Sequence, residues 1–361
     1  MRSNRPPVPA VPADIGSAFA PALIEWQARC GRHGLPWQGT RDPYRVWLSE
    51  VMLQQTQVAT VLSYYPRFLA RFGNVQALAE ASVDEVMALW SGLGYYSRAR
   101  NLHRCARMVV SDHGGVFPAS AQALATLPGI GASTAAAIAA FCHGERVSIA
   151  DGNVRRVLSR VLAYEGDLAQ AAGQAHLWDV AQQLAPAAPS LADMQAYTQG
   201  LMDLGATVCT RSRPACTVCP MAGVCRGRQQ GDPARFPVKT RRVARRHESW
   251  WLLAILRKGP GGTEVWLERR PAPGIWAGLH CLPVFANEPD AALCLPGGLD
   301  AAMALPVIAH ALTHRELRLH PLSVNVEVGW QPDRPAGRWW PLARLDEVGM
   351  PVPVKELLSG F

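Results

Sequence analysis

The spacing of apolar residues divides the chain into two parts. Up to about Leu204, apolar positions recur every three to four residues in segments separated by Gly, Pro and Ser, which predicts helices. One helix is expected to begin after Asp42. The other expected helices cover residues 19–30, 83–90, 97–111, 120–126, 133–142, 154–164 and 176–184. After Glu248, short segments rich in β-branched and aromatic residues lie between Gly and Pro turns. The expected strands are residues 250–256, 264–267 and 322–328, so an all-α domain precedes a smaller α+β domain.

Composition places the domain boundaries. The 361 residues are too many for one typical domain and fit two. Residues 1–13 are basic and Pro-rich, lack the apolar run of a signal peptide, and are expected to form a flexible tail. The helical domain is expected to span residues 14–225, including a cysteine-rich loop, and the second domain residues 248–361. Between them, the Arg- and Pro-rich residues 226–247 are expected to form a basic linker suited to lie along a phosphate backbone.

One helix carries many polar side chains in the stretch SEVMLQQTQV, residues 49–58. Asp42 is placed to cap this helix, and Pro43 fits its first turn, where the backbone N–H has no partner within the helix. At about 100° per residue, one apolar stripe is formed by Trp47, Val51, Val58, Val61 and Leu62. Gln54 falls within this stripe and Glu50 at its edge, although burying an unpaired polar group costs about 1–3 kcal/mol. Two explanations stay open, namely an internal hydrogen-bond network and a cleft that receives a polar ligand.

Four of the nine cysteines form one compact cluster. Cys209, Cys216, Cys219 and Cys225 have the spacing C-x6-C-x2-C-x5-C, which predicts a metal site because thiolates are strong metal ligands. The spacing differs from the paired C-x2-C of a zinc knuckle, and thiolates also hold iron-sulfur clusters, so the residues alone leave the metal open. An odd number of cysteines without a secretory signal favours a reducing compartment, and a cytoplasmic location is expected.

Two further segments carry chemistry. The sequence LPGIG at residues 127–131 predicts a glycine hairpin between two helices, whose backbone N–H groups are suited to hold a phosphate, although a tight helical corner has the same pattern. Asp151 lies where it can cap the next helix, whose dipole favours a negative charge. Glu50, beside an apolar stripe, is expected to be pushed toward its protonated form. Two carboxyl groups driven apart in this way provide the acid and the electrostatic partner that cleavage of a glycosidic bond requires.

The chain carries a net positive charge, which bears on the kind of partner it binds. A charge of +8 and a pI near 9.2 are typical of proteins that bind nucleic acid, and also of proteins with an ordinary basic surface. Residues 114–142 contain no charged residue but are interrupted by Pro and Gly, so they are expected to form two short buried helices rather than a membrane span. No membrane partner is expected.

Five segments, taken together, resemble one known family. SEVMLQQTQV, GLGYYSRARNL, LPGIGASTA, DGNV and the four-cysteine loop occur in an order and at spacings similar to the helix-hairpin-helix DNA glycosylases, and more closely to the MutY-type adenine DNA glycosylases. The resemblance covers nearly the whole chain and its motifs are specific. It implies an all-α helix-hairpin-helix glycosylase domain with a [4Fe-4S] loop, followed by a smaller α+β Nudix-like domain that reads 8-oxoguanine. The implied activity is base excision repair of double-stranded DNA, by hydrolysis of the N-glycosidic bond of adenine mispaired with 8-oxoguanine or guanine.

The resemblance also implies roles for individual residues. Glu50 matches the acid that protonates adenine, and Asp151 the carboxylate that stabilises the oxocarbenium-like sugar or attacks it, with Asn153 supporting that aspartate. Gln55 matches the side chain that fills the space left by the flipped base, and Tyr95 one that wedges into the stack beside the damaged guanine. Further expected DNA contacts are Gln54, Thr56, Leu127, Gly129, Gly131, Ser133, Thr313 and His314. The matching cluster ligands are Cys209, Cys216, Cys219 and Cys225.

The sequence differs from known glycosylase motifs at Ser133 and at Leu312-Thr313-His314, and it lacks the catalytic motif of Nudix hydrolases. Ser133 stands where the lyase members of the superfamily carry a nucleophilic lysine, which implies a monofunctional glycosylase that leaves the strand intact. Leu312-Thr313-His314 stands where the family typically carries Phe-Ser-His, so the hydroxyl is kept and the aromatic ring is lost. The glutamate-rich Nudix signature is absent from the sequence, so pyrophosphate hydrolysis is not expected.

Two alternatives stay beside this reading. One is a glycosylase of the same fold for another mismatched base, such as thymine opposite guanine. The other is a non-catalytic damaged-DNA-binding protein, which needs neither Glu50 nor Asp151. The enzyme is expected to act as a monomer.

Overall fold

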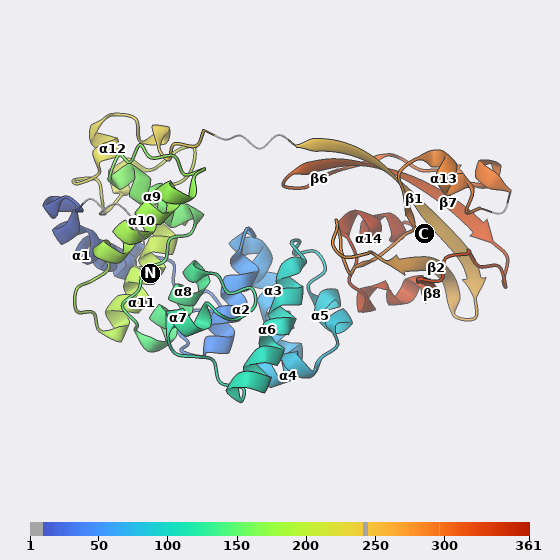
Figure 1. The fold of residues 1–361 in the computed structure, drawn as a ribbon, viewed down its shortest axis with the longest axis horizontal. Coiled ribbons are helices and arrows are strands. Elements are labelled where there is room, and N and C mark those ends of the chain that lie inside the picture. The colour runs from blue at the N-terminus through green and yellow to red at the C-terminus, as the bar shows by residue number, and fades with distance from the viewer. Residues whose placement is uncertain (1–9, 241–244, 296) are drawn as a thin grey trace, which may run out of the picture. The chain divides into compact units, whose positions relative to one another are not determined.

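The computed structural model describes residues 10–240, 245–295 and 297–361 (Figure 1). Contacts between Cα atoms divide these residues into two units. The first unit holds residues 10–69, 74–76 and 104–240, and the second holds residues 70–73, 77–103, 245–295 and 297–361. Residues 77–103 therefore belong with the C-terminal sheet, although the sequence pattern grouped them with the helices. Of the expected tail and linker, residues 1–9 and 241–244 lie outside the described part of the chain.

Within residues 10–240 every regular element is a helix, which confirms the all-α expectation. The helices are α1 (Ala13–Cys30), α2 (Pro43–Leu53), α3 (Val58–Arg71), α4 (Val75–Glu80), α5 (Val83–Leu89), α6 (Ser97–His113), α7 (Ala121–Leu124), α8 (Ala132–His143), α9 (Gly152–Val161), α10 (Ala171–Leu184), α11 (Leu191–Asp203) and α12 (Arg226–Gln229). A π-helical turn, Leu204–Val208, continues α11. Helix α1 begins before the expected residue 19 and contains Pro21, and helices α3, α4 and α11 were not expected as separate elements.

The start of α2 is confirmed and its expected continuation is wrong. The Asp42 carboxylate accepts a hydrogen bond from the Tyr44 N–H at 2.9 Å, with Pro43 at the first helical position. The helix ends at Leu53, because Gln54 has an extended ψ of 109° and Gln55 a left-handed φ of 58°, neither of which fits a right-handed helix. The single stripe expected through residue 62 is therefore interrupted by a turn before α3.

The uncharged stretch 114–142 forms two helices joined by a turn, as expected. Helix α7 is a single turn capped by the Ser120 hydroxyl, and Gly129 in the following turn has a φ of 78°, which suits glycine. Helix α8 buries its alanines 135–137, 139 and 140 in the core. No helix in residues 10–240, 245–295 and 297–361 has both the length and the apolar character needed to cross a membrane.

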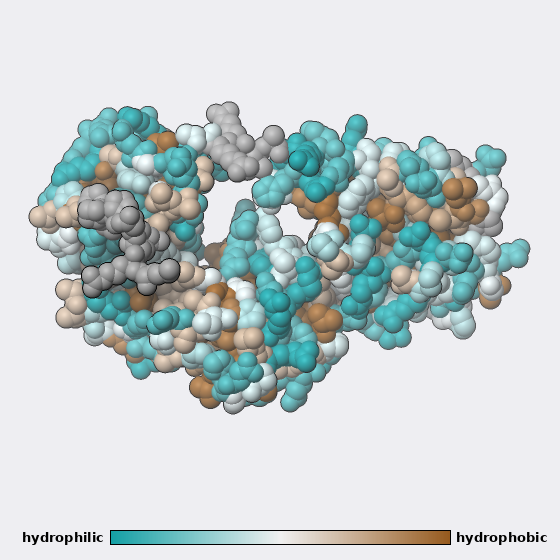
Figure 2. Space-filling view, in the orientation of Figure 1, coloured by the Kyte–Doolittle hydropathy of each residue, from teal (hydrophilic) through white to brown (hydrophobic). Residues whose placement is uncertain are grey.

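The core of the first unit forms between α1, α8, α9, α10 and α11. Its fully buried side chains include Phe19 and Leu23 of α1 and Tyr197 and Leu201 of α11. Burial of such side chains stabilises the fold by about 1.5–3 kcal/mol each. In the view of Figure 2, hydrophilic residues cover most of the surface and apolar residues are scattered among them, as on an ordinary protein surface.

The second unit is built on one mixed sheet. Its strands are β1 (Arg246–Gly259), β2 (Gly262–Arg269), β3 (His280–Cys281), β4 (Val284–Phe285), β5 (Met303–Ala304), β6 (Ile308–Ala311), β7 (Arg315–Val326) and β8 (Gly337–Pro341). The main path is β3-β2-β1-β7-β5, and β1 runs parallel to β7 over twelve residue pairs. Helices α13 (Glu288–Ala292) and α14 (Val352–Leu358) belong to the unit, as does α5 within residues 77–103. The expected α+β character is confirmed, with β1, β2 and β7 at or near the expected positions.

Candidate active site

A large cavity in the first unit opens onto one side of α2. Its wall combines the α1–α2 loop, residues 31–42, with α2 and α11. The lining residues include residues 32–35 and 37–41 of the loop, Val46, Ser49, Glu50 and Leu53 of α2, and Gln195, Gln199 and Met202 of α11. Glu50 is partly buried, while Trp47 and Val51 on the other side of α2 are packed in the interior. The polar residue at the edge of the expected stripe therefore faces a cavity rather than a closed network.

The carboxyl group of Glu50 has an unusual protonation state. Burial of the carboxyl group, and to a smaller extent the charge of Asp151, raise the pKa of Glu50 to about 8. Burial disfavours the charged form because the surrounding protein solvates an anion poorly. The expectation that Glu50 is pushed toward its protonated form is confirmed. The negative charge of Asp151 acts in the same direction, because it disfavours a second negative charge on Glu50.

Asp151 is held at the N-terminus of α9. Its Oδ1 accepts hydrogen bonds from the backbone N–H groups of Asn153 at 2.9 Å and Val154 at 2.8 Å. The residue is exposed. Two N–H groups and the positive end of the helix dipole surround the negative charge. The capping role read from the sequence is therefore confirmed.

The side chain of Asn153 contacts Arg156, which the sequence analysis did not single out. Its Oδ1 accepts a hydrogen bond from Arg156 Nη2 at 2.8 Å, while Arg156 Nε donates to the Cys209 carbonyl at 2.9 Å. Arg156 Nη2 also donates to the Gly205 carbonyl at 2.7 Å. Asn153 thus supports Asp151 through its backbone, and its amide side chain joins the turn to the cysteine loop.

The end of α2 and the start of α8 meet beside Asp151. Gln54 Nε2 donates to Thr134 Oγ1 at 3.2 Å, and Ser133 Oγ accepts a hydrogen bond from the Ala150 N–H at 3.3 Å. Gln55 is exposed at the tip of the turn between α2 and α3. These two contacts bring the glutamine turn after Glu50 together with Ser133 and the residue before Asp151, although Gln54 and Thr134 are 80 residues apart in sequence.

The glycine hairpin presents an open helix N-terminus. Leu127 is buried under the turn, whereas Gly129 and Gly131 are exposed. Gly131 is the N-cap of α8 and supplies no side-chain cap, and an added Cβ there would meet no atom within 4 Å. The positive end of the α8 dipole therefore carries no side-chain cap at Gly131.

Tyr95, Thr313 and His314 lie in the second unit, in residues 77–103 and in the loop between β6 and β7. The hydroxyl groups of Tyr95 and Thr313 are 3.1 Å apart, and the Tyr95 ring is 44% exposed. The Arg98 guanidinium lies 5.5 Å from the Tyr95 ring centroid, a neighbour that the sequence pattern did not single out. His314 is exposed, and its carbonyl accepts a hydrogen bond from the Arg246 N–H.

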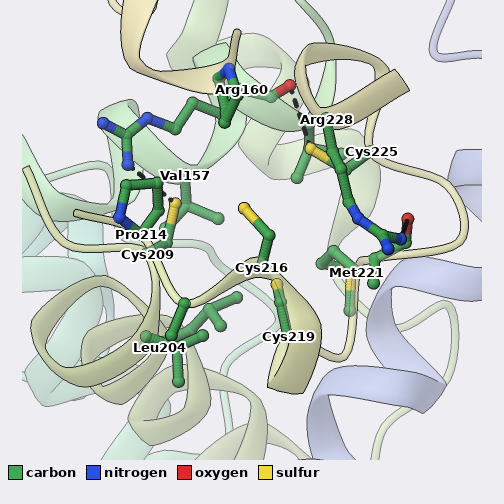
Figure 3. A pocket seen from close by; sticks show the side chains of 15 residues that line it. Val157, Arg160, Leu204, Cys209, Pro214, Cys216, Cys219, Met221, Cys225 and Arg228 are labelled. Atoms are coloured by element: carbon green, nitrogen blue, oxygen red, sulfur yellow. Dashed lines mark hydrogen bonds between the residues drawn. The ribbon is translucent and has the colours of Figure 1, made fainter. Parts of the chain in front are cut away.

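The four clustered cysteines line one pocket in the first unit (Figure 3). Arg160, which is 2% exposed, donates from Nη1 to Cys209 Sγ at 3.4 Å, and Cys225 Sγ donates to the Arg160 carbonyl at 3.3 Å. In the described part of the chain, no group of three or more His, Cys, Asp or Glu residues is arranged to hold a metal ion. All four thiols of the predicted metal site thus belong to one pocket.

Comparisons with known proteins agree with this architecture. Residues 48–183 match the HhH-GPD superfamily of base excision DNA repair proteins, and residues 252–360 match the NUDIX domain. The chain is 30% identical to the adenine DNA glycosylase of Buchnera aphidicola subsp. Acyrthosiphon pisum (strain APS), over 95% of this chain and 97% of that protein. It is 38% identical to the adenine DNA glycosylase of Homo sapiens, over 76% of this chain and 58% of that protein.

A solved structure supports the helical part of this match. A thermostable thymine-DNA glycosylase superposes with a TM-score of 0.52 and 26% identity, covering 60% of this chain and 98% of that one. The helix-hairpin-helix glycosylase fold followed by a Nudix-like domain, expected from the sequence, is confirmed. The chain therefore belongs to the adenine DNA glycosylase family of base excision repair enzymes, hydrolases that act on the N-glycosidic bond.

Proposed function

We propose that this enzyme removes adenine paired with 8-oxoguanine or guanine in duplex DNA and leaves the strand intact. The observation that carries the proposal is Glu50, a carboxyl group with a pKa of about 8 that lines a cavity within electrostatic reach of Asp151. Near neutral pH, such a group is mostly protonated and can donate its proton. A DNA-binding protein without catalysis has no use for this pair.

The chemistry follows from the two carboxyl groups. The target nucleotide leaves the base stack, because its glycosidic bond cannot be reached inside the duplex. Glu50 gives its proton to a ring nitrogen of adenine while the bond between that base and C1′ breaks and its electrons pass to the base. The Asp151 carboxylate stabilises the positive charge that develops on the sugar. Water then adds to C1′, and its proton returns to Glu50.

Several described residues are suited to hold the DNA. The exposed Gln55 at the tip of its turn can occupy the space left by the flipped base, with Gln54 and Thr56 anchoring the turn. The open N-terminus of α8 behind Gly131 suits a backbone phosphate, with Leu127 and Gly129 shaping the hairpin. In the second unit, Tyr95, Thr313 and His314 are proposed to read the guanine or 8-oxoguanine.

The cysteine pocket is proposed to hold a [4Fe-4S] cluster on Cys209, Cys216, Cys219 and Cys225. Four cysteine thiols that line one pocket are the ligand set that a [4Fe-4S] cluster takes. The cluster would supply a rigid centre that fixes the loop after α11. A purified protein without the broad visible absorption of iron-sulfur clusters, and with zinc in its place, would contradict this assignment.

Ser133 supports hydrolysis without strand cleavage. Its hydroxyl accepts a hydrogen bond from the Ala150 N–H and carries no amine that can form a Schiff base with the sugar. Duplex containing adenine opposite 8-oxoguanine is therefore expected to break only after alkaline treatment of the abasic product. Strand breaks that accumulate without alkali, at the rate of base loss, would overturn this part of the proposal.

The decisive experiment measures base release from a panel of duplexes. The panel pairs adenine with 8-oxoguanine, guanine and cytosine, and thymine with guanine, since a thymine-DNA glycosylase shares the helical fold. The expected result is release of adenine, fastest opposite 8-oxoguanine. Release of thymine alone would contradict the proposal. Glu50→Gln is the matched control, because it removes the acid proton while keeping the shape. This variant is expected to lose excision and to keep its affinity for the duplex.

A further inference from the structure

Much of the wall of the cavity beside Glu50 is a loop rather than a helix. Residues 32–35 and 37–41 of the α1–α2 loop line the cavity, and this segment contains no helix or strand. Loops without regular hydrogen bonding hold one conformation only where specific contacts fix them. The cavity can keep its shape only if such contacts exist.

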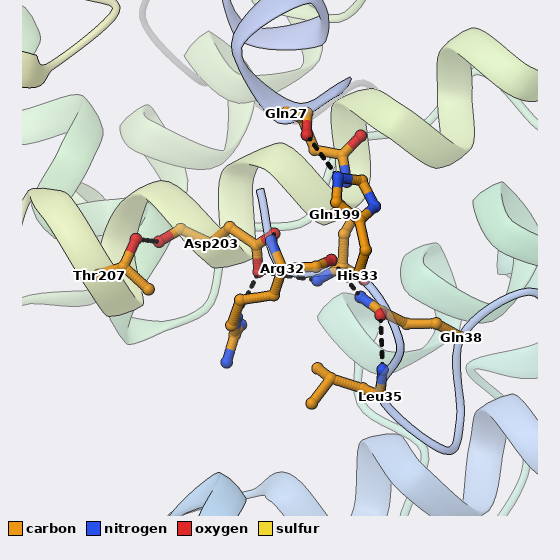
Figure 4. A network of polar contacts seen from close by, with 8 residues as sticks. All are labelled: Gln27, Arg32, His33, Leu35, Gln38, Gln199, Asp203 and Thr207. Atoms are coloured by element: carbon orange, nitrogen blue, oxygen red, sulfur yellow. Dashed lines mark hydrogen bonds and ion pairs between the residues drawn. The ribbon is translucent and has the colours of Figure 1, made fainter. Parts of the chain in front are cut away.

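The strongest of these contacts joins the loop to the last residue of α11. The Asp203 carboxylate accepts a hydrogen bond from the Arg32 backbone N–H at 2.8 Å and another from Arg32 Nε at 2.7 Å (Figure 4). Gln199 Nε2 donates to the same carboxylate at 2.8 Å. The Asp203 side chain is 0% exposed and that of Arg32 is 28% exposed. One carboxylate therefore fixes both the backbone and the side-chain direction of Arg32.

Gln38 connects Arg32 to the rest of the loop through two hydrogen bonds. Gln38 Nε2 donates to the Arg32 carbonyl at 2.9 Å, and Gln38 Oε1 accepts a hydrogen bond from the Leu35 N–H at 3.0 Å. Gly34 has a φ of 82°, which lets the chain reverse between these contacts. Trp37, the residue before Gln38, is buried, and its ring centroid lies 5.5 Å from that of Tyr65. The loop is thus closed on itself and attached to α11 at Arg32.

A buried ion pair of this kind contributes little net stability. Removing two charges from water costs several kcal/mol, which offsets most of their attraction. Its main effect is to select one geometry, because a carboxylate with three hydrogen bonds has few alternative arrangements. The location of the pair, between α11 and a loop that both line the cavity, indicates that the selected geometry is that of the cavity.

We propose that Asp203 is a positioning residue for base excision, which holds the α1–α2 loop through Arg32 as the wall of the cavity that receives the base. The proposal rests on the function proposed above. Asp203 itself touches neither the base nor Glu50 in this role. It acts by fixing where Arg32, Trp37 and Gln38 stand around the base.

The same wall controls the surroundings of Glu50. The charged or titratable groups that line the cavity with Glu50 are Arg32, His33 and Arg41 from the loop, and Asp151 acts on it from the start of α9. Burial is the larger cause of the raised pKa of Glu50. A loosened loop would admit water, weaken this burial and lower the pKa of the acid. A displaced wall therefore changes the pH dependence of excision, which a purely structural contact elsewhere would not.

Three variants test the proposal on duplex containing adenine opposite 8-oxoguanine. Asp203→Asn keeps the shape and removes the charge, Arg32→Lys keeps the charge and loses the Nε donor, and the double variant Arg32→Gln with Asp203→Asn leaves no buried unpaired charge. Each is expected to slow single-turnover excision about ten- to a hundredfold, the usual effect of a small misplacement. The affinity for the duplex is expected to stay unchanged, and the alkaline limb of the pH–rate profile is expected to move to lower pH.

A matched control separates positioning from stability. Glu264→Gln breaks a comparable partly buried pair with Arg257 in the second unit, so it is expected to leave the excision rate and its pH profile unchanged. The double variant is expected to recover the melting temperature of the wild type while excision stays slow. Recovery of both, or an unchanged pH profile in every soluble variant, would refute the proposal. Should Asp203→Asn be insoluble, Arg32→Lys tests the same contact.

The outcome is distinguishable from failure of the proposed function. If the wild-type enzyme releases no adenine, the function itself is wrong. If it releases adenine and the Asp203 and Arg32 variants match its rate, only the positioning role is wrong.

Discussion

The phenolic oxygen of Tyr95 lies 3.1 Å from Oγ1 of Thr313, which joins two exposed side chains 218 residues apart in the second unit. Tyr95 has a φ of 46°, an uncommon conformation for a bulky residue. Arg98 holds this turn by donating from Nη2 to the carbonyls of Leu93 at 3.1 Å and Gly94 at 3.2 Å. The direction of the Tyr95 ring is therefore set by contacts on both sides.

This contact predicts a change in lesion selectivity. Thr313→Val keeps the shape of the side chain and removes the hydroxyl, so it is expected to reduce the preference for 8-oxoguanine over guanine about fivefold, the effect of one hydrogen bond of about 1 kcal/mol. Thr313→Ser keeps the hydroxyl and is expected to retain the preference. Excision rates on both mispairs provide the measurement, and equal selectivity in all three proteins would exclude Thr313 from lesion reading.

The raised pKa of Glu50 predicts the pH dependence of the rate. The acid acts when protonated, so single-turnover excision is expected to be highest below a pH of about 8 and to fall as the pH rises through that value. The measurement is the excision rate from pH 6 to about pH 10. A rate that keeps rising across this range would show that Glu50 acts as a base rather than as an acid.

The same shift predicts how stability responds to pH. Between the ordinary pKa of a glutamate, 4.5, and about 8, the folded state binds a proton that the unfolded state has lost. The contribution of Glu50 to stability is therefore full below 4.5 and falls as the pH rises through this window. Glu50→Gln is expected to melt at a higher temperature than the wild type at pH 9, with the difference shrinking toward pH 5. Melting curves at both values provide the measurement, and a difference that grows on acidification would contradict the shift.

The buried guanidinium of Arg160 is expected to stabilise the loops around the cysteine pocket. Besides Cys209 Sγ, it donates to the carbonyls of Thr210 at 2.6 Å, Arg211 at 2.9 Å and Phe236 at 3.1 Å. Arg160→Met leaves these buried acceptors unpaired and is expected to cost about 3 kcal/mol or more.

The matched control for Arg160 is Arg228→Met. Arg228 is exposed and lines the same pocket, and its guanidinium donates a hydrogen bond to the Ala222 carbonyl at 2.7 Å. Melting temperature and iron content are the measurements. We expect Arg160→Met to lower both and Arg228→Met to change neither. Equal losses in the two variants would mean that the pocket, rather than the buried guanidinium, is sensitive to substitution.

Local sequence determined the helices, the caps and the chemical character of the site. Asp42 and Asp151 were recognisable as caps because capping depends on one side chain and the next three residues. The protonation of Glu50 followed from its place beside an apolar stripe. The break after Leu53 was missed, because a glutamine in a left-handed conformation has no local signature and is held by tertiary contacts such as Gln54 to Thr134.

Only the tertiary structure decided what surrounds the acid. Arg32, Gln38 and Asp203 show no mutual pattern in the sequence, because the loop and α11 meet only when the helices pack. The same holds for Arg160, whose charge is satisfied by carbonyl groups from two distant loops. The sequence by itself therefore determined which groups can do the chemistry, since residue identity, helix capping and the apolar pattern around Glu50 can be read locally. The structure decided how they are held, since burial and long-range hydrogen bonds arise only from packing.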